Sequence, residues 1–178
     1  MIGTVLRFWF EEIPRERWFA SDPAFDDLVA ARFGGLVEKA GRGAFHPGPE
    51  TPEGALALVL LLDQFPRHIH RGHRRAFAYD ARACSAARKA IDCGFDRKLP
   101  AERRGFLYLP FEHSENLADQ ELSVRLFEAL GDPVGLDYAR RHYEIIARFG
   151  RFPHRNAVLG RKSTTEEEAF LNQPGSSF

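Results

Sequence analysis

Three short stretches of the sequence place ionisable side chains directly beside a proline and aromatic residues. They span residues 62–68, 108–115 and 149–156. Their apolar flanks indicate that they lie against the hydrophobic core, where an isolated charge costs several kcal/mol unless a partner compensates it. We therefore expect the charged side chains of the three stretches to meet, and to neutralise one another beside a cleft.

The first stretch carries Asp63, Gln64 and Arg67 where an apolar helix is expected to end. Residues three or four apart share a helix face, and the helix dipole favours a cation near the C-terminus. Two interpretations are open. These side chains belong to a ligand site, or Arg67 caps the last carbonyls and pairs with Asp63.

The second stretch offers Glu112, His113 and Glu115, a combination suited to acid–base work. Glu112 and His113 are the candidates for a general base. Imidazole and carboxylate groups also bind metals, but the spacing matches no zinc motif. We therefore expect neither a metal site nor a cofactor here.

The third stretch supplies cationic and amide donors from Arg151, His154, Arg155 and Asn156. Such groups hold a carboxylate or a phosphate through paired hydrogen bonds. The alternative is structural, because the same donors would satisfy the acidic second stretch through internal salt bridges.

Other kinds of chemistry find little support. The sequence has no glycine-rich nucleotide loop and no nucleophile elbow. Cys84 and Cys93 lie nine residues apart in one expected helix, roughly 13 Å along its axis, so they are expected to be reduced core residues rather than a disulfide. His142 falls on an apolar helix face and is expected to be a hydrogen-bonded core residue.

The composition limits the kinds of partner that the protein is expected to bind. The 25 basic and 25 acidic residues cancel, so no net field attracts nucleic acid or an anionic membrane. There is no signal-peptide pattern, and the longest apolar run is far too short to cross a bilayer. We expect a cytoplasmic protein whose partner is a small anionic molecule or a peptide. The oligomeric state is left open.

The elements that must position these side chains are helices, because helical periodicity dominates and sustained two-residue alternation is lacking. We expect one all-α domain over residues 1–178. Pro66 is expected to end the central apolar helix, and Pro110 to interrupt or kink a later one. Expected caps are Asp80, Ser114 and a box formed by Ser163 and Glu166. The expected helices cover residues 4–12, 23–41, 52–65, 80–93, 100–108, 114–130, 133–149 and 163–171, with a loop at 41–50.

Five motifs together resemble an uncharacterised, mainly bacterial family known as domain of unknown function 924. They lie at residues 5–10, 62–67, 108–115, 149–156 and 170–178, so the resemblance covers nearly the whole chain. It implies stacked antiparallel helical hairpins in a right-handed superhelix similar to tetratricopeptide-repeat proteins, with extra terminal helices. It implies no known activity and no catalytic residues.

Three functional hypotheses follow. The leading one is a binding module whose polar pocket takes a small anionic ligand or a peptide terminus. The second is a hydrolase-like enzyme in which Glu112 or His113 acts as general base, with or without a metal, while Arg151 and Arg155 stabilise negative charge. The third is a purely structural ion-pair network. The binding hypothesis assigns the pocket to Gln64, Arg67, Glu112, His113, Arg151, His154, Arg155 and Asn156.

Overall fold

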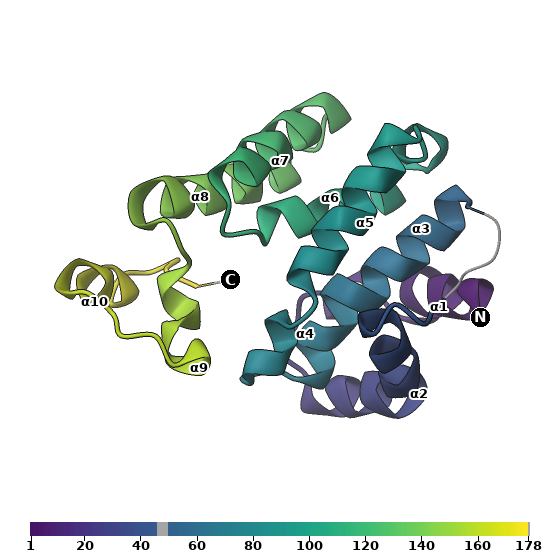
Figure 1. Ribbon diagram of the computed structural model, residues 1–178, viewed down its shortest axis with the longest axis horizontal. Coiled ribbons are helices and arrows are strands. Elements are labelled where there is room, and N and C mark those ends of the chain that lie inside the picture. Colours follow the sequence, from purple (N-terminus) through teal and green to yellow (C-terminus); the bar gives the residue numbers. More distant parts are fainter. Residues whose placement is uncertain (46–49, 178) are drawn as a thin grey trace. The chain divides into compact units, whose positions relative to one another are not determined.

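A computed structural model of the protein describes residues 1–45 and 50–177 (Figure 1). The part of the expected loop at 46–49 therefore lies outside the described residues. The described residues form helices, turns and connecting segments without a strand, which confirms the all-α prediction. Within these ranges, no helix is long and apolar enough to cross a membrane. The chain forms two compact units, which are described separately.

Unit 1 comprises residues 1–71 and 75–110. Its core is aromatic: Phe8, Trp9 and Phe65 are fully buried, and the Trp9 and Phe65 ring centroids lie 5.2 Å apart. The helix pairs α2 with α4 and α3 with α5 pack around it. The helices are α1 (Ile2–Arg7), α2 (Pro23–Gly41), α3 (Pro52–Val59), α4 (Phe65–Ile69), α5 (Asp80–Asp92) and most of α6 (Ala101–Glu112), joined by 3₁₀ turns at Arg15–Arg17, Arg74–Phe77 and Asp96–Lys98 and π turns at Phe8–Glu12 and Leu60–Gln64.

Strong local signals place the starts of α2 and α3 as predicted. Asp22 accepts a hydrogen bond from the Phe25 amide, and Thr51 accepts one from the Gly54 amide. A proline follows each cap at the first helical position, where its missing N–H costs nothing.

The prediction that Pro66 ends the central helix is wrong. A π turn at Leu60–Gln64 follows α3 and leads directly into α4, which contains Pro66. A proline ring clashes with the carbonyl four residues earlier in a regular α-helix, and the wider π turn just before it changes that spacing. The stretch Asp63–Arg67 is therefore helical throughout. Likewise, Pro110 lies inside α6, which continues to Glu112.

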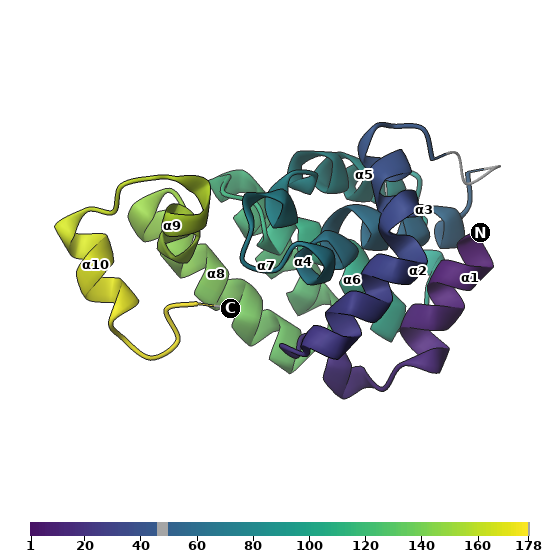
Figure 2. The ribbon, with the colours of Figure 1, turned by 90° about the horizontal axis from the view of Figure 1, so that it is seen from below.

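Unit 2 contains residues 72–74 and the described residues from 111 onward. Its main feature is a helical hairpin of α7 (Leu117–Leu130) and α8 (Pro133–Phe149), which run side by side in both views (Figures 1 and 2). Gly131, with a φ of 72°, ends α7, and Asp132 caps α8. The hairpin is followed by a 3₁₀ turn at Pro153–Arg155, α9 (Asn156–Leu159) and α10 (Thr165–Leu171).

Three predicted caps and one predicted core residue differ from the structure. Asn116, not Ser114, caps α7, while Ser114 donates to Asp119. The capping box of α10 joins Thr164 and Glu167, one residue later than predicted. Asp80 is the first residue of α5 rather than its cap, and Cys93 is exposed rather than in the core.

Candidate functional site

The first polar stretch forms a partly buried brace in unit 1. The Arg67 guanidinium donates to both carboxylate oxygens of Asp80, at 2.9 and 3.0 Å, and to the Asp63 backbone carbonyl at 2.7 Å. It also lies 3.2 Å from the Asp63 carboxylate. Gln64 donates to Asp63 at 2.6 Å, and both of these side chains are buried. We call these four side chains the Arg67 brace.

Electrostatics favours a structural role for this brace. Burial disfavours the charge on Arg67, but the carboxylates of Asp63 and Asp80 more than offset this and raise the pKa of the guanidinium. The donors of Arg67 are thus directed at groups of the protein itself. Asp80 is the one member of the brace that the sequence did not assign to the site. It lies in α5 whereas Arg67 lies in α4, so the spacing of residues within one helix does not indicate that they meet.

A second buried contact in unit 1 was also missed. His68 is buried, with Nδ1 2.8 Å from Asp26 and Nε2 3.1 Å from the Trp18 carbonyl. Arg71 donates to both oxygens of the same carboxylate. Burial lowers the pKa of His68, while Asp26 acts in the opposite direction. This set ties α4 to α2.

In unit 2 the second and third polar stretches meet. Glu115 accepts a hydrogen bond from the Phe152 amide at 2.8 Å. Arg161 forks onto the same carboxylate at 2.7 and 2.9 Å and also donates to the Phe152 carbonyl at 3.1 Å. Burial disfavours the charge of Glu115, but these hydrogen bonds prevail and lower its pKa.

Arg151 and Asn156 belong to a network centred on Glu167. Arg151 donates to both Glu167 oxygens, at 2.6 and 2.8 Å, and Asn156 donates to one of them at 3.3 Å. Asn156 also accepts from Arg161 at 3.0 Å, which links this network to Glu115. The hydrogen bonds from Arg151, together with the Thr164 amide, lower the pKa of Glu167 to about 2.

These contacts form what we call the Glu167 network. It fastens α9 and α10 to the segment that follows α8, through the side chains Glu115, Arg151, Asn156, Arg161 and Glu167. Arg161 and Glu167 lie outside the three stretches, and sequence reasoning missed both as partners. Glu167 could have been found from its position three residues after Thr164, which matches a capping box.

A different set of polar side chains surrounds the fully buried ring of Phe152. The Arg155 guanidinium carbon lies 4.5 Å from the ring centroid, and the rings of His142 and His154 lie 5.5 and 5.6 Å from it. The His113 ring is 6.2 Å from that of His142. We call Glu112, His113, His142, His154 and Arg155 the Phe152 cluster.

His142 and Glu112 meet in the interior of this cluster, and each is buried. The His142 Nδ1 atom lies 2.8 Å from the Tyr138 carbonyl and 3.5 Å from a Glu112 oxygen. Because a carbonyl only accepts, Nδ1 carries the proton and Nε2 is the basic nitrogen of the neutral ring. Gln120 holds the Glu112 backbone by donating to its carbonyl at 2.6 Å. The predicted core position of His142 is confirmed.

Buried His142 and partly buried His154 are both neutral at pH 7. Burial, and after it the charge of a neighbouring His113, lower the pKa of His142 to about 3. Burial, and after it the charge of Arg155, lower the pKa of His154 to about 4. Arg155 itself is buried and keeps its charge under all ordinary conditions. The cluster thus places one fixed positive charge and the two neutral rings of His142 and His154 around Phe152.

The ten residues predicted for the site are divided between the two units. Asp63, Gln64 and Arg67 lie in the Arg67 brace of unit 1. The other seven lie in unit 2, where Glu115, Arg151 and Asn156 join the Glu167 network and Glu112, His113, His154 and Arg155 join the Phe152 cluster. Among the residues that the structure describes, no three His, Cys, Asp or Glu side chains are arranged to hold a metal ion.

Comparison with known proteins identifies the family. The family model described as bacterial protein of unknown function (DUF924) matches residues 5–175. A similar solved structure is that of the protein of unknown function ATU0120 from Agrobacterium tumefaciens, which is 40% identical, with 96% of each chain covered and a TM-score of 0.91. No curated protein matches the chain. On the strength of the matched residues, the chain belongs to the DUF924 family of bacterial proteins of unknown function.

Proposed function

We propose that the protein is a cytoplasmic binding module whose unit 2 takes a small anionic ligand at the Phe152 cluster. The observation that supports this most directly is the position of Arg155. Its guanidinium is buried and lies over the Phe152 ring, with the neutral rings of His142 and His154 against the same phenyl group. A buried guanidinium is well suited to hold a carboxylate or a phosphate.

The histidines give this site a second property. An anion placed beside Arg155 would favour the protonated form of any imidazole within a few ångströms. The pKa of His154 is about 4 in the absence of an anion, so the ring is neutral near pH 7 and can gain a proton when a bound anion raises this pKa. Binding should therefore be accompanied by proton uptake, and the affinity should increase as the pH falls from neutrality.

Within the third stretch, the Glu167 network distinguishes residues with a structural role from those proposed to contact the ligand. Arg151 and Asn156, two of the donors originally assigned to the pocket, are held by Glu167. We infer that they position the chain on either side of Arg155 rather than contact a ligand. The proposed ligand-contacting residues are the members of the Phe152 cluster that lie in the second and third stretches, Glu112, His113, His154 and Arg155. The Arg67 brace is assigned to stability.

The wider architecture and location are part of the same proposal. The α7–α8 hairpin is the kind of unit from which tetratricopeptide-like superhelices are built, and we propose this stacking for the chain. We also propose a cytoplasmic location. The equal numbers of acidic and basic residues argue against nucleic acid or an anionic membrane as partner. The C-terminal carboxylate of a peptide has the same chemistry as a small anion, so a peptide is the larger of the two proposed ligands.

The proposal predicts that inorganic phosphate stabilises the protein through Arg155. A ligand that binds only the folded state raises the melting temperature, by about 2–4 °C per kcal/mol for a protein of 178 residues. We expect a rise that grows with phosphate concentration, and its loss in Arg155→Gln. The measurement is thermal unfolding across a phosphate series, with a sulfate series and an acetate series beside it.

Two further variants make this test decisive. Arg151→Gln weakens the Glu167 network and should lower the melting temperature while keeping the phosphate-dependent rise. Arg155→Lys serves as the test variant if Arg155→Gln fails to fold. It keeps the positive charge and should retain part of the phosphate-dependent rise. A rise of equal size in Arg155→Gln and the wild type would refute the proposal, as would the absence of any rise with all three anions.

A second candidate function is acid–base catalysis of a hydrolase type, favoured by the 3.5 Å approach of Glu112 to His142. In this version Glu112 or His113 acts as general base and Arg155 stabilises the developing negative charge. A screen of ester, phosphoester and amide substrates would show turnover that Glu112→Gln abolishes. Phosphate binding without any turnover, in the presence and absence of divalent metals, would leave binding as the function.

A further inference from the structure

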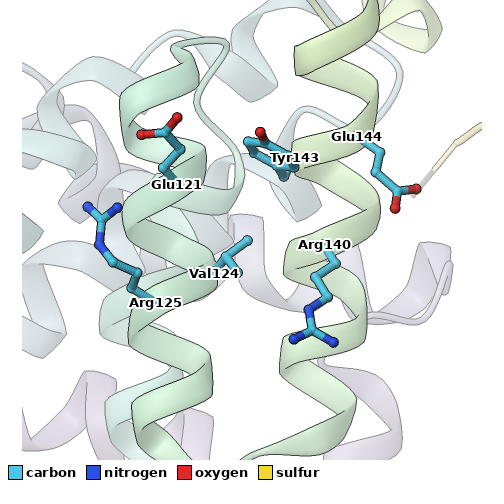
Figure 3. Close-up of a pocket in the computed structure, with 6 residues that line it drawn as sticks. All are labelled: Glu121, Val124, Arg125, Arg140, Tyr143 and Glu144. Atoms are coloured by element: carbon cyan, nitrogen blue, oxygen red, sulfur yellow. The ribbon is translucent and has the colours of Figure 1, made fainter.

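The α7–α8 hairpin carries a groove that none of the three polar stretches contributes to. It has a volume of about 390 Å³, which lies within the range of small-ligand sites. Val124 and Tyr143 lie between the two helices, and the four charged side chains flank them (Figure 3). The lining consists of Glu121, Val124, Arg125, Arg140, Tyr143 and Glu144.

The charges of this groove are sorted by sign along its length. On α7, Glu121 precedes Arg125 by one helical turn, whereas on α8 Arg140 precedes Glu144. Because the two helices of a hairpin are antiparallel, both glutamates lie at one end and both arginines at the other (Figure 3). Four residues of helix separate the two ends by about 6 Å along the axis.

These charges are not used to neutralise one another. Among the described residues, Glu121, Arg125 and Glu144 form no ion pair within 4 Å, and Arg140 has a 3.6 Å contact with the exposed Glu128. The same spacing does give an ion pair elsewhere on α8, where Arg141 lies 2.7 Å from Asp137. Each end of the groove therefore carries two like charges, although Arg140 already contacts Glu128. In Figure 3 the charged groups of Arg125 and Glu144 extend to the outer sides of their helices, so these exposed side chains must turn toward the groove to hold a ligand there.

We propose that this groove binds an unblocked dipeptide, with its carboxylate between Arg125 and Arg140 and its ammonium group between Glu121 and Glu144. Two extended residues span at most about 7 Å, which matches the separation of the two charged ends. The Tyr143 ring and the Val124 side chain provide an apolar floor for the peptide. The proposal rests on charge complementarity within unit 2 and does not depend on the Phe152 cluster.

The test is a titration of the full-length protein with dialanine, followed by amide chemical shifts in NMR. Exposed ion pairs are weak, so we expect a dissociation constant on the order of 1 mM that increases with salt. Shift changes should centre on Val124 and Tyr143. N-acetylated dialanine and C-amidated dialanine should each bind about threefold more weakly or worse, because each lacks one charge.

Surface variants assign the two ends. Arg125→Gln should weaken dialanine but not its C-amide, and Glu121→Gln should weaken dialanine but not its N-acetyl form. Both residues are exposed, so these changes are compatible with folding. Asp137→Asn, which breaks an ion pair on the same helix, is the matched control and should leave binding unchanged. Equal binding of blocked and unblocked peptides, or no shift changes at the groove, would overturn the proposal.

Discussion

The free energy of unfolding is expected to fall by on the order of 5 kcal/mol between about pH 7 and pH 4. The cause lies in His142 and His154, which have pKa values of about 3 and about 4 in the folded protein. An unfolded histidine has a pKa of about 6.5, and each unit of difference corresponds to about 1.4 kcal/mol. Both rings therefore resist protonation only while the protein is folded.

The sign follows from proton binding. Between about pH 6.5 and pH 4, His142 and His154 bind protons in the unfolded chain but not in the folded protein, so acid favours unfolding. The contribution is fully present above the unfolded pKa and is lost as the pH falls toward the folded values. Glu115 and Glu167, whose pKa values are lowered, lose their contribution at more acidic pH. His68 of unit 1, whose pKa is also lowered, changes stability in the same direction as the two histidines.

Urea unfolding at a series of pH values measures this effect. His154→Gln should flatten the dependence of stability on pH between about pH 6.5 and pH 4, because the uncharged amide does not titrate. His73→Gln, which changes an exposed histidine outside the Phe152 cluster, is the matched control. If His154→Gln and the wild type had the same pH dependence, the assignment of acid sensitivity to the Phe152 cluster would be wrong.

Replacing Arg67 by methionine is expected to lower the free energy of unfolding by about 3–5 kcal/mol. The side chain compensates the fully buried carboxylate of Asp63 and also holds Asp80 with two hydrogen bonds. Methionine fills a similar space but leaves Asp63 as a buried charge without its cation. The loss is large because one member of the pair remains behind.

Denaturant unfolding of Arg67→Met gives the size of this effect. The control is Arg15→Met, which removes an exposed ion pair with Glu102 and should change stability by about 1 kcal/mol or less. In the double variant with Asp63→Asn, part of the lost stability should return, because no buried charge is left. A loss below about 1 kcal/mol in Arg67→Met would show that the first stretch is not a stabilising brace.

Local sequence signals predicted the helices well. Asp22 followed by Pro23, and Thr51 followed by Pro52, define helix starts through groups within three residues of one another. The helix expected to end at residue 130 does end there, and Gly131 follows it in a left-handed conformation that favours glycine. Such signals depend on short-range geometry and can be recognised without knowledge of the tertiary structure.

Predictions that depended on a choice between neighbours were less secure. Ser163 and Thr164 both carry a hydroxyl group, and each has a glutamate three residues later, so the sequence alone does not decide which one caps α10. Pro66 was assigned to a helix end because the rule for proline assumes a regular α-helix. That assumption fails here because a π turn at Leu60–Gln64 precedes the proline, and the sequence has no clear marker for such a turn.

The candidate site was only partly predictable for a related reason. The expectation that buried charges need partners correctly drew attention to Glu115 and the third stretch, which meet at the Phe152 amide. It did not identify Arg161, Glu167 or Asp80 as the partners, because these side chains arrive from separate turns and helices. Desolvation shows that a partner is required, but the fold decides which residue supplies it.

The proposed anion site is tested most directly by the pKa of His154, followed by NMR with and without phosphate. If phosphate binds beside Arg155, the pKa of His154 should rise from about 4 toward its ordinary value as phosphate is added. The same titration in Arg155→Lys should show a weaker rise. A His154 pKa that stays the same at saturating phosphate would contradict the account.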